Sequence, residues 1–80
     1  MSKSYEFLIK TTRKDIDFIN KIIEAYEGVG VVRTISAEKG LLNIITTYDF
    51  KEYLRDILED LNTKWVKAEI LDEKPWTGGL

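Results

Sequence analysis

Apolar and polar residues alternate at the start of the chain with a period of two. One set is Tyr5, Phe7 and Ile9, and the set between them is Glu6, Leu8 and Lys10. This alternation is typical of a β-strand that buries one face. The spacing then changes to three and four, which predicts an amphipathic helix with its apolar positions at Ile16, Ile19, Ile22, Ile23 and Tyr26. Thr12 and Asp15 are spaced as a capping box at its start, and Gly28 suits its end.

The middle of the chain predicts an antiparallel β-hairpin. Residues 29–36 are rich in β-branched side chains, and residues 41–47 resume a strand pattern after a short turn that ends in Gly40. Glycine in such a turn accepts backbone conformations that other residues avoid.

A second helix and a last strand follow the hairpin. Asp49 and Glu52 form a capping box ahead of an apolar stripe made of Phe50, Leu54, Ile57, Leu58 and Leu61. We expect Asn62 and Thr63 to end this helix and residues 65–71 to form the final strand. Residues 72–80 contain the only proline of the chain, which predicts an irregular C-terminal tail.

The order strand, helix, two strands, helix, strand predicts a single α+β domain over residues 5–71, with the ferredoxin-like split βαβ topology (βαββαβ). In this fold a four-stranded antiparallel sheet carries two helices on one face and leaves the other face open. Many unrelated activities occur on this fold, so function depends on the chemistry of particular residues.

The amino-acid composition excludes most common kinds of catalytic site. Among 80 residues there is no cysteine and no histidine, so the chain has no thiolate nucleophile, no imidazole base and no usual metal ligand. We therefore expect no enzyme activity, no cofactor and no metal site. The net charge of -2 argues against nucleic acid as a partner, and no apolar run approaches the roughly 18 residues of a membrane span. The expected location is the cytoplasm.

The loop after the first strand is the first candidate site. Its basic and hydroxyl side chains are Lys10, Thr11, Thr12, Arg13 and Lys14. Cations at a helix start oppose the helix dipole, and a bound anion would reverse this penalty. The loop thus predicts a site for a small anionic ligand, with Arg33 as a second contact. The alternative is that Asp15 and Asp17 neutralise the turn while the basic side chains stay in solvent.

The open face of the sheet is the second candidate site. Its expected apolar residues are Leu8, Val31, Ile35, Leu41 and Ile45. A patch of this kind indicates an interface, most simply that of a homodimer. Arg33 and Asn43 lie among these residues and need a polar partner.

Three other interpretations concern the same surfaces. The tail could cover the open face with Trp76 or Leu80, or the chain could be an adaptor that docks another protein through that face or through Trp76. RNA binding by the sheet is less favoured, because the expected central strands present no pair of exposed aromatic residues.

The chain resembles ACT-like regulatory domains in its element order over residues 5–71 and in the hairpin between Val29 and Thr47. The resemblance implies dimerisation and small-ligand binding near the first loop, where ACT domains commonly carry an acidic residue followed by glycine and this chain has Lys10 to Lys14. The chain also looks like small uncharacterised bacterial families of this length, which implies a fold and no activity.

Overall fold

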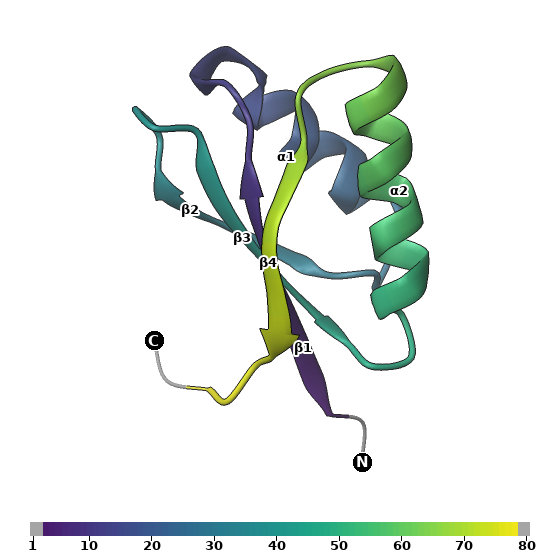
Figure 1. Ribbon diagram of the computed structural model, residues 1–80. Coiled ribbons are helices and arrows are strands. Elements are labelled where there is room, and N and C mark those ends of the chain that lie inside the picture. Colours follow the sequence, from purple (N-terminus) through teal and green to yellow (C-terminus); the bar gives the residue numbers. More distant parts are fainter. Residues whose placement is uncertain (1–2, 79–80) are drawn as a thin grey trace.

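The computed structural model describes residues 3–78 and has the expected ferredoxin-like topology (Figure 1). Its elements are β1 (Ser4–Lys10), the 3-10 turn η1 (Arg13–Asp15), α1 (Ile16–Ala25), β2 (Val31–Ser36), β3 (Leu41–Thr47), α2 (Lys51–Lys64) and β4 (Glu69–Pro75). The four strands form one sheet in the order β2-β3-β1-β4, and all neighbours are antiparallel. The first and third strands are therefore central, as the sequence predicted.

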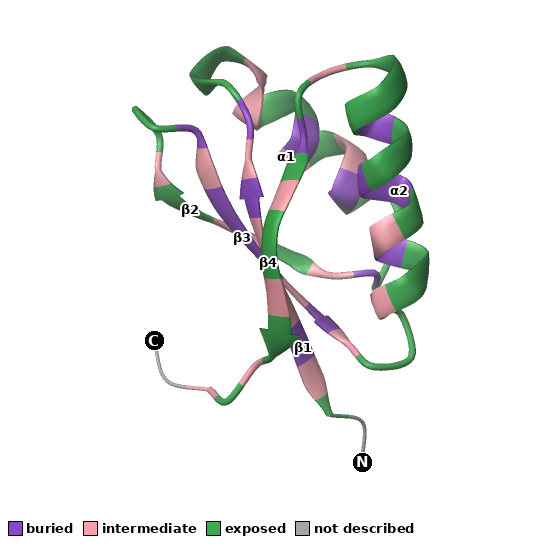
Figure 2. Ribbon diagram, in the orientation of Figure 1, coloured by how far each residue is buried: buried purple, intermediate pink, exposed green. Residues whose placement is uncertain are grey.

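The core lies between the sheet and the two helices, which both cover the same face (Figure 2). The alternation of β1 buries Phe7 and Ile9, and that of β3 buries Leu42 and Ile44. The helices supply Ile19, Ile23, Leu54, Leu58 and Leu61. Because buried apolar area is the main stabilising contribution in so small a domain, these two layers hold the fold together.

The last strand differs from the sequence prediction. It runs from Glu69 to Pro75, whereas we expected residues 65–71, so residues 72–75 belong to the sheet and not to an irregular tail. The backbone N–H groups of Trp65 and Val66 donate to the carbonyl of Leu61 and finish α2. The segment predicted to start the strand is thus used to end the helix.

A bulge in β4 interrupts its alternation of inward and outward residues. Ile9 pairs with Ile70 but Leu8 pairs with Asp72, so Leu71 is an extra residue opposite β1. Beyond the bulge the alternation is reversed relative to the first half of the strand. Glu73 consequently lies on the helix side of the sheet, where a charged side chain was not expected.

The helix starts also differ from the predicted capping boxes. The Thr12 hydroxyl donates to Oδ2 of Asp15 at 2.7 Å, and neither η1 nor α1 has a side-chain cap. Phe50 is the N-cap residue of α2, again without a side-chain cap, and α2 runs through Thr63 to Lys64. The Thr63 hydroxyl donates to the carbonyl of Glu59 at 2.8 Å, which accommodates threonine inside the last turn.

Two glycines are fixed by close backbone contacts. Gly40 has φ +67°, and a Cβ there would lie 2.0 Å from the carbonyl oxygen of Thr11. The N–H of Thr11 donates to the carbonyl of Gly40 at 2.7 Å, which ties the hairpin turn to the loop after β1. A Cβ at Gly30 would lie 3.0 Å from the carbonyl oxygen of Ile45, so the chain's own β3 fills the space beside this glycine.

Candidate functional site

The open sheet face is the face of the sheet that the helices leave uncovered. We define it by Leu8, Val31, Arg33, Ile35, Leu41, Asn43 and Ile45, which share one face of β1, β2 and β3. Ile35 is an extra residue at a bulge of β2. All five residues predicted as an interface lie here. Val31 and Ile35 on the edge strand β2 are 63% and 55% exposed, while Leu8, Leu41 and Ile45 are half-buried. Apolar side chains this exposed and this close together are typical of a contact surface.

Asn43 lies near the centre of the open sheet face and is only 7% exposed. Its Nδ2 donates to Oε1 of Glu6 on the neighbouring strand at 2.8 Å. The sequence required a polar partner for this amide but did not identify it. This hydrogen bond gives the Asn43 amide a partner among apolar neighbours. Arg33 lies on the same face and has no hydrogen bond or ion pair within residues 3–78.

A shallow hollow of about 220 Å³ lies beside this pair. Its lining residues are Glu6, Leu8, Ile35, Asn43, Asp72, Glu73 and Lys74. Pockets for drug-sized ligands usually have volumes of about 300–1,000 Å³. The open sheet face is therefore better shaped for a broad contact than for a buried small molecule.

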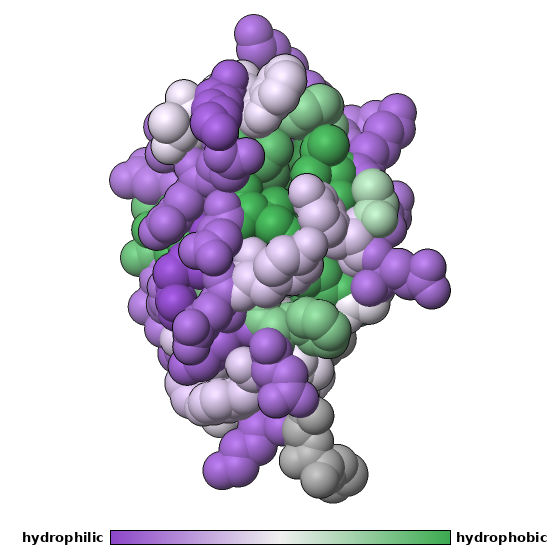
Figure 3. Space-filling model, turned by 90° about the vertical axis from the view of Figure 1, so that its right-hand side faces the viewer, coloured by the Kyte–Doolittle hydropathy of each residue, from purple (hydrophilic) through white to green (hydrophobic). Residues whose placement is uncertain are grey.

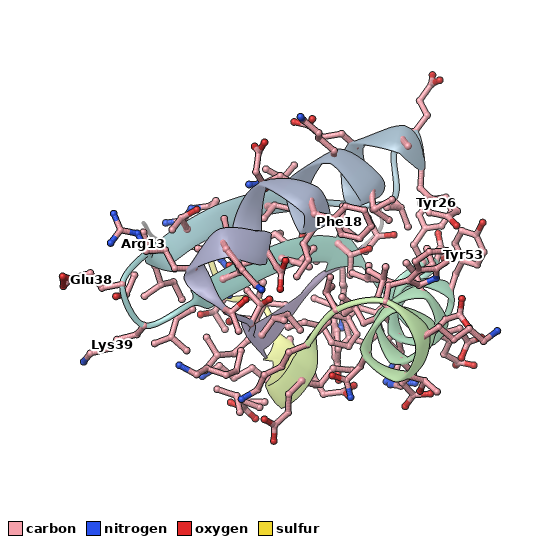
Figure 4. All side chains as sticks on the ribbon, turned by 90° about the horizontal axis from the view of Figure 1, so that it is seen from above. Arg13, Phe18, Tyr26, Glu38, Lys39 and Tyr53 are labelled. Atoms are coloured by element: carbon pink, nitrogen blue, oxygen red, sulfur yellow. The ribbon has the colours of Figure 1, made fainter. Side chains whose placement is uncertain are left out.

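The predicted anion loop is used largely for internal contacts. The Lys10 ammonium donates to the carbonyl of Lys39, and the Thr12 hydroxyl is bonded to Asp15. The Thr11 hydroxyl is buried and finds no hydrogen-bond partner within residues 3–78. Arg13 and Lys14 are exposed on η1, and Figure 4 shows Arg13 pointing outward at the end of the molecule that also carries the hairpin tip.

Arg33 is not part of that loop. It pairs in register with Asn43 of β3, which pairs with Leu8 of β1, which pairs with Asp72 of β4. The structure therefore gathers the five loop residues at one end of β1 and places Arg33 within the open sheet face.

A polar network that the sequence did not reveal crosses the helix side of the sheet. Glu73 accepts hydrogen bonds from Nε and Nη2 of Arg55 and from the Tyr5 hydroxyl, the last at 2.9 Å. The hydrogen bond from Arg55 holds the pKa of Glu73 below its ordinary value. Burial, together with Glu73, raises the pKa of Tyr5. The network joins β1, α2 and β4, and the bulge at Leu71 that creates it leaves no sequence signal.

A second surface lies between the two helices and was also missed. We call it the interhelical groove and define it by Phe18, Ile22, Tyr26, Asp56, Ile57, Asp60, Leu61 and Trp65. Its volume is about 640 Å³, and Figure 3 shows an apolar hollow between more polar ridges. The sequence signal is the spacing of Phe18, Ile22 and Tyr26 at four residues, of which Ile22 and Tyr26 were expected on the apolar side of the helix.

The described residues lack two features that would point to particular functions. Within residues 3–78 no helix is long and apolar enough to cross a bilayer. In the same part of the chain no group of three or more acidic residues is arranged to hold a metal ion.

Comparison with known proteins identifies a family but no characterised relative. No curated protein and no solved structure matches the chain. The model of the family DUF4911, described as a domain of unknown function, matches residues 9–64, from the end of β1 to the end of α2. That match covers more than half of the chain, which therefore belongs to the DUF4911 family.

Proposed function

We propose that this protein is a non-enzymatic binding module that forms a homodimer through its open sheet face. The observation that carries the proposal is the row Arg33, Asn43, Leu8, Asp72, which has a cation at one edge of the sheet and a carboxylate at the other. Exposed Val31 and Ile35 lie on the edge strand that carries the cation. The face thus combines apolar surface with charges that a second copy can match.

The geometry of a face-to-face dimer explains this match. In the aligned arrangement, two sheets that pack face to face keep their strands within about 30° of one another. A two-fold axis running along the strands, between β3 and β1, turns the β2 edge of one copy over the β4 edge of the other. Arg33 then lies opposite Asp72 of the partner subunit, and the contact occurs twice because a two-fold interface uses the same patch on both copies.

The small size of the domain supports association. A chain of 80 residues buries a limited core, so burial of Val31, Ile35 and their neighbours against a second copy would add stability. RNA is a poor alternative occupant of this face, because the aromatic rings of β1, Tyr5 and Phe7, are buried on the opposite side.

The chemistry of the described residues favours binding over catalysis. Among the described residues, pKa values are shifted for Tyr5, Arg55 and Glu73. Tyr5 and Arg55 each donate a hydrogen bond to Glu73. The raised pKa of Tyr5 keeps it protonated and the lowered pKa of Glu73 keeps it ionised, so neither is suited to exchange a proton near neutral pH. Their role in this proposal is to fasten α2 and β4 to the centre of the sheet.

Size-exclusion chromatography of two variants tests which face is used. Ile35→Lys places a charge in the open sheet face and should elute as a monomer. Trp65→Lys makes a comparable change on the helix side, where the side chain is 69% exposed, and should elute as the dimer. The opposite pattern would assign the interface to the helices. A monomeric wild type would favour the adaptor interpretation, in which another protein covers the open sheet face.

A second proposal is ACT-like sensing of a small anion at the loop from Lys10 to Lys14. It is supported by Arg13 and Lys14, which are exposed together on η1. It is weakened by the internal contacts of Lys10 and Thr12. Thermal unfolding with phosphate or sulfate tests it: a rise in midpoint that Arg13→Ala abolishes supports an anion site, and an unchanged midpoint rejects it.

A further inference from the structure

The interhelical groove is an elongated apolar channel with aromatic ends. Phe18 on α1 and Tyr26, the C-cap residue of that helix, are eight residues apart, which corresponds to about 12 Å. Asp56 and Trp65 span about 13 Å on the α2 side by the same rise per residue. The groove is therefore long enough for about two turns of a third helix.

The floor and the rim of the groove differ in character. Ile57 and Leu61 are buried at its base, while Phe18, Tyr26 and Trp65 are exposed large apolar residues at its sides. Tyr26 packs edge-to-face against Tyr53 of α2, with ring centroids 5.9 Å apart, so the two helices touch through aromatic rings at one end. Figure 4 shows Phe18 and Tyr26 directed from α1 toward α2. Helix-in-groove recognition uses apolar floors of this kind.

The charge of the groove is one-sided. Asp56 and Asp60 line its α2 wall and are four residues apart, so their carboxylates follow one another along the helix. Asp60 is paired with Lys64 at 2.9 Å, and Asp56 has no ion pair within residues 3–78. The lining contains no basic residue. An occupant that complements this wall carries Lys or Arg along one flank.

We propose that the interhelical groove binds an amphipathic helix of a partner protein, with an apolar stripe that enters the groove and a basic flank that lies against Asp56 and Asp60. The apolar stripe would use residues spaced i, i+3 or i+4, and i+7. This site is independent of the open sheet face and of dimerisation there. It makes the protein an adaptor on its helix side.

The described part of the chain does not offer such a helix to a second copy. Both α1 and α2 use their apolar faces in the core, and their exposed charges include the acidic residues Asp17, Glu24, Glu52 and Glu59. An anionic membrane surface is also disfavoured, because Asp56 and Asp60 would face lipid headgroups of the same sign. The complementary occupant is a basic helix from another protein.

The test uses two synthetic 14-residue helical peptides that share a leucine stripe and differ in one flank, lysine in one and glutamate in the other. The protein carries Trp76→Phe, so that its fluorescence reports Trp65 alone. The lysine peptide should shift the Trp65 emission to the blue and give a saturable titration, and the glutamate peptide should bind at least about tenfold more weakly.

Two matched variants locate the charge contact. Asp56→Lys changes the groove wall, and Glu59→Lys makes the same charge change on an exposed position of the same helix. We expect Asp56→Lys to weaken binding of the lysine peptide at least about tenfold and to strengthen binding of the glutamate peptide. Glu59→Lys should change the affinity for either peptide by less than about threefold at physiological salt. Circular dichroism confirms that both variants remain folded.

Several results would overturn the proposal. The first is an unchanged Trp65 emission with the lysine peptide at millimolar concentration. The second is equal affinity for the two peptides, and the third is an equal effect of Asp56→Lys and Glu59→Lys on that affinity. A blue shift produced by anionic lipid vesicles but by neither peptide would instead assign the groove to membrane contact.

Discussion

Arg33 and Asp72 lie at opposite ends of one cross-strand row on the open sheet face, with Asn43 and Leu8 between them. Neighbouring strands are about 4.8 Å apart, so three spacings put the two backbones about 14 Å from each other. That separation prevents Arg33 from pairing with Asp72 of its own chain, where Asp72 lies 3.9 Å from the ammonium of Lys74. A second copy turned about an axis along the strands brings the two charges together.

Reversal of either charge should therefore weaken the dimer, and reversal of both should restore it. Arg33→Asp and Asp72→Arg should each weaken the dimer about tenfold, because two symmetric contacts become repulsive. The double variant should recover most of the loss. Dissociation constants from sedimentation equilibrium measure all three, and a double variant as weak as the single ones would exclude the Arg33–Asp72 contact.

The contact between Gly40 and Thr11 predicts a large stability difference between two glycine substitutions. Gly40→Ala places a Cβ 2.0 Å from the Thr11 carbonyl oxygen, whereas a Cβ at Gly28 meets nothing within 4 Å. Both glycines have positive φ, +67° and +79°, so the backbone strain of alanine is similar at about 1 kcal/mol. We expect Gly28→Ala to cost about that amount and Gly40→Ala about 4 kcal/mol or more.

Thermal unfolding checks this pair of variants. About 1 kcal/mol corresponds to roughly 4–8 °C in midpoint for a domain of this size, so Gly28→Ala should stay folded at room temperature. Equal midpoints for the two variants would show that the hairpin turn moves away from Thr11 without cost.

The Glu73 network predicts a particular pH dependence of stability. Arg55 lowers the pKa of Glu73 in the folded protein, so the carboxylate stabilises the fold above the ordinary glutamate pKa. This contribution falls as the pH drops through the lowered pKa. Glu73→Gln should cost about 2 kcal/mol at pH 7 by weakening the bonds to Arg55 and Tyr5, and the difference from wild type should shrink in acid.

Urea unfolding of both proteins between pH 7 and pH 3 measures that difference. Glu24→Gln, at an exposed position of α1, is the control for loss of a negative charge. A stability difference between wild type and Glu73→Gln that stays constant down to pH 3 would contradict the assigned role of Arg55.

The sequence predicted the fold wherever one periodicity ran without interruption. Alternation placed Leu8, Leu41 and Ile45 on the open sheet face, and the residues next to them, Phe7, Ile9, Leu42 and Ile44, are buried in the core. The hairpin followed from its turn. The last strand was predicted too early in the chain because Trp65 and Val66 end α2. Its second half was missed because Leu71 is a bulge residue, and a bulge depends on pairing with β1 that no local pattern records. The inward position of Glu73 was missed for the same reason.

Of the two candidate surfaces, the open sheet face was predicted from the sequence and the interhelical groove was not. The apolar residues of the open sheet face on β1, β2 and β3 were predicted from alternation, whereas Asp72 was not, because residues 72–75 were expected to form an irregular tail. The interhelical groove was not predicted, because it depends on how far α1 and α2 are separated across the sheet, and Phe18 and Tyr26 carry the same helical spacing whether they are buried or exposed.

The most direct test of the central proposal is the molar mass of the wild-type protein by sedimentation equilibrium, measured from about 1 μM to 1 mM. Self-association through the open sheet face predicts a mass that rises from that of the 9.3 kDa monomer to twice that value and stops there, because a two-fold interface is closed. A mass that stays at 9.3 kDa over the whole range would contradict the homodimer and leave the open sheet face to a different protein.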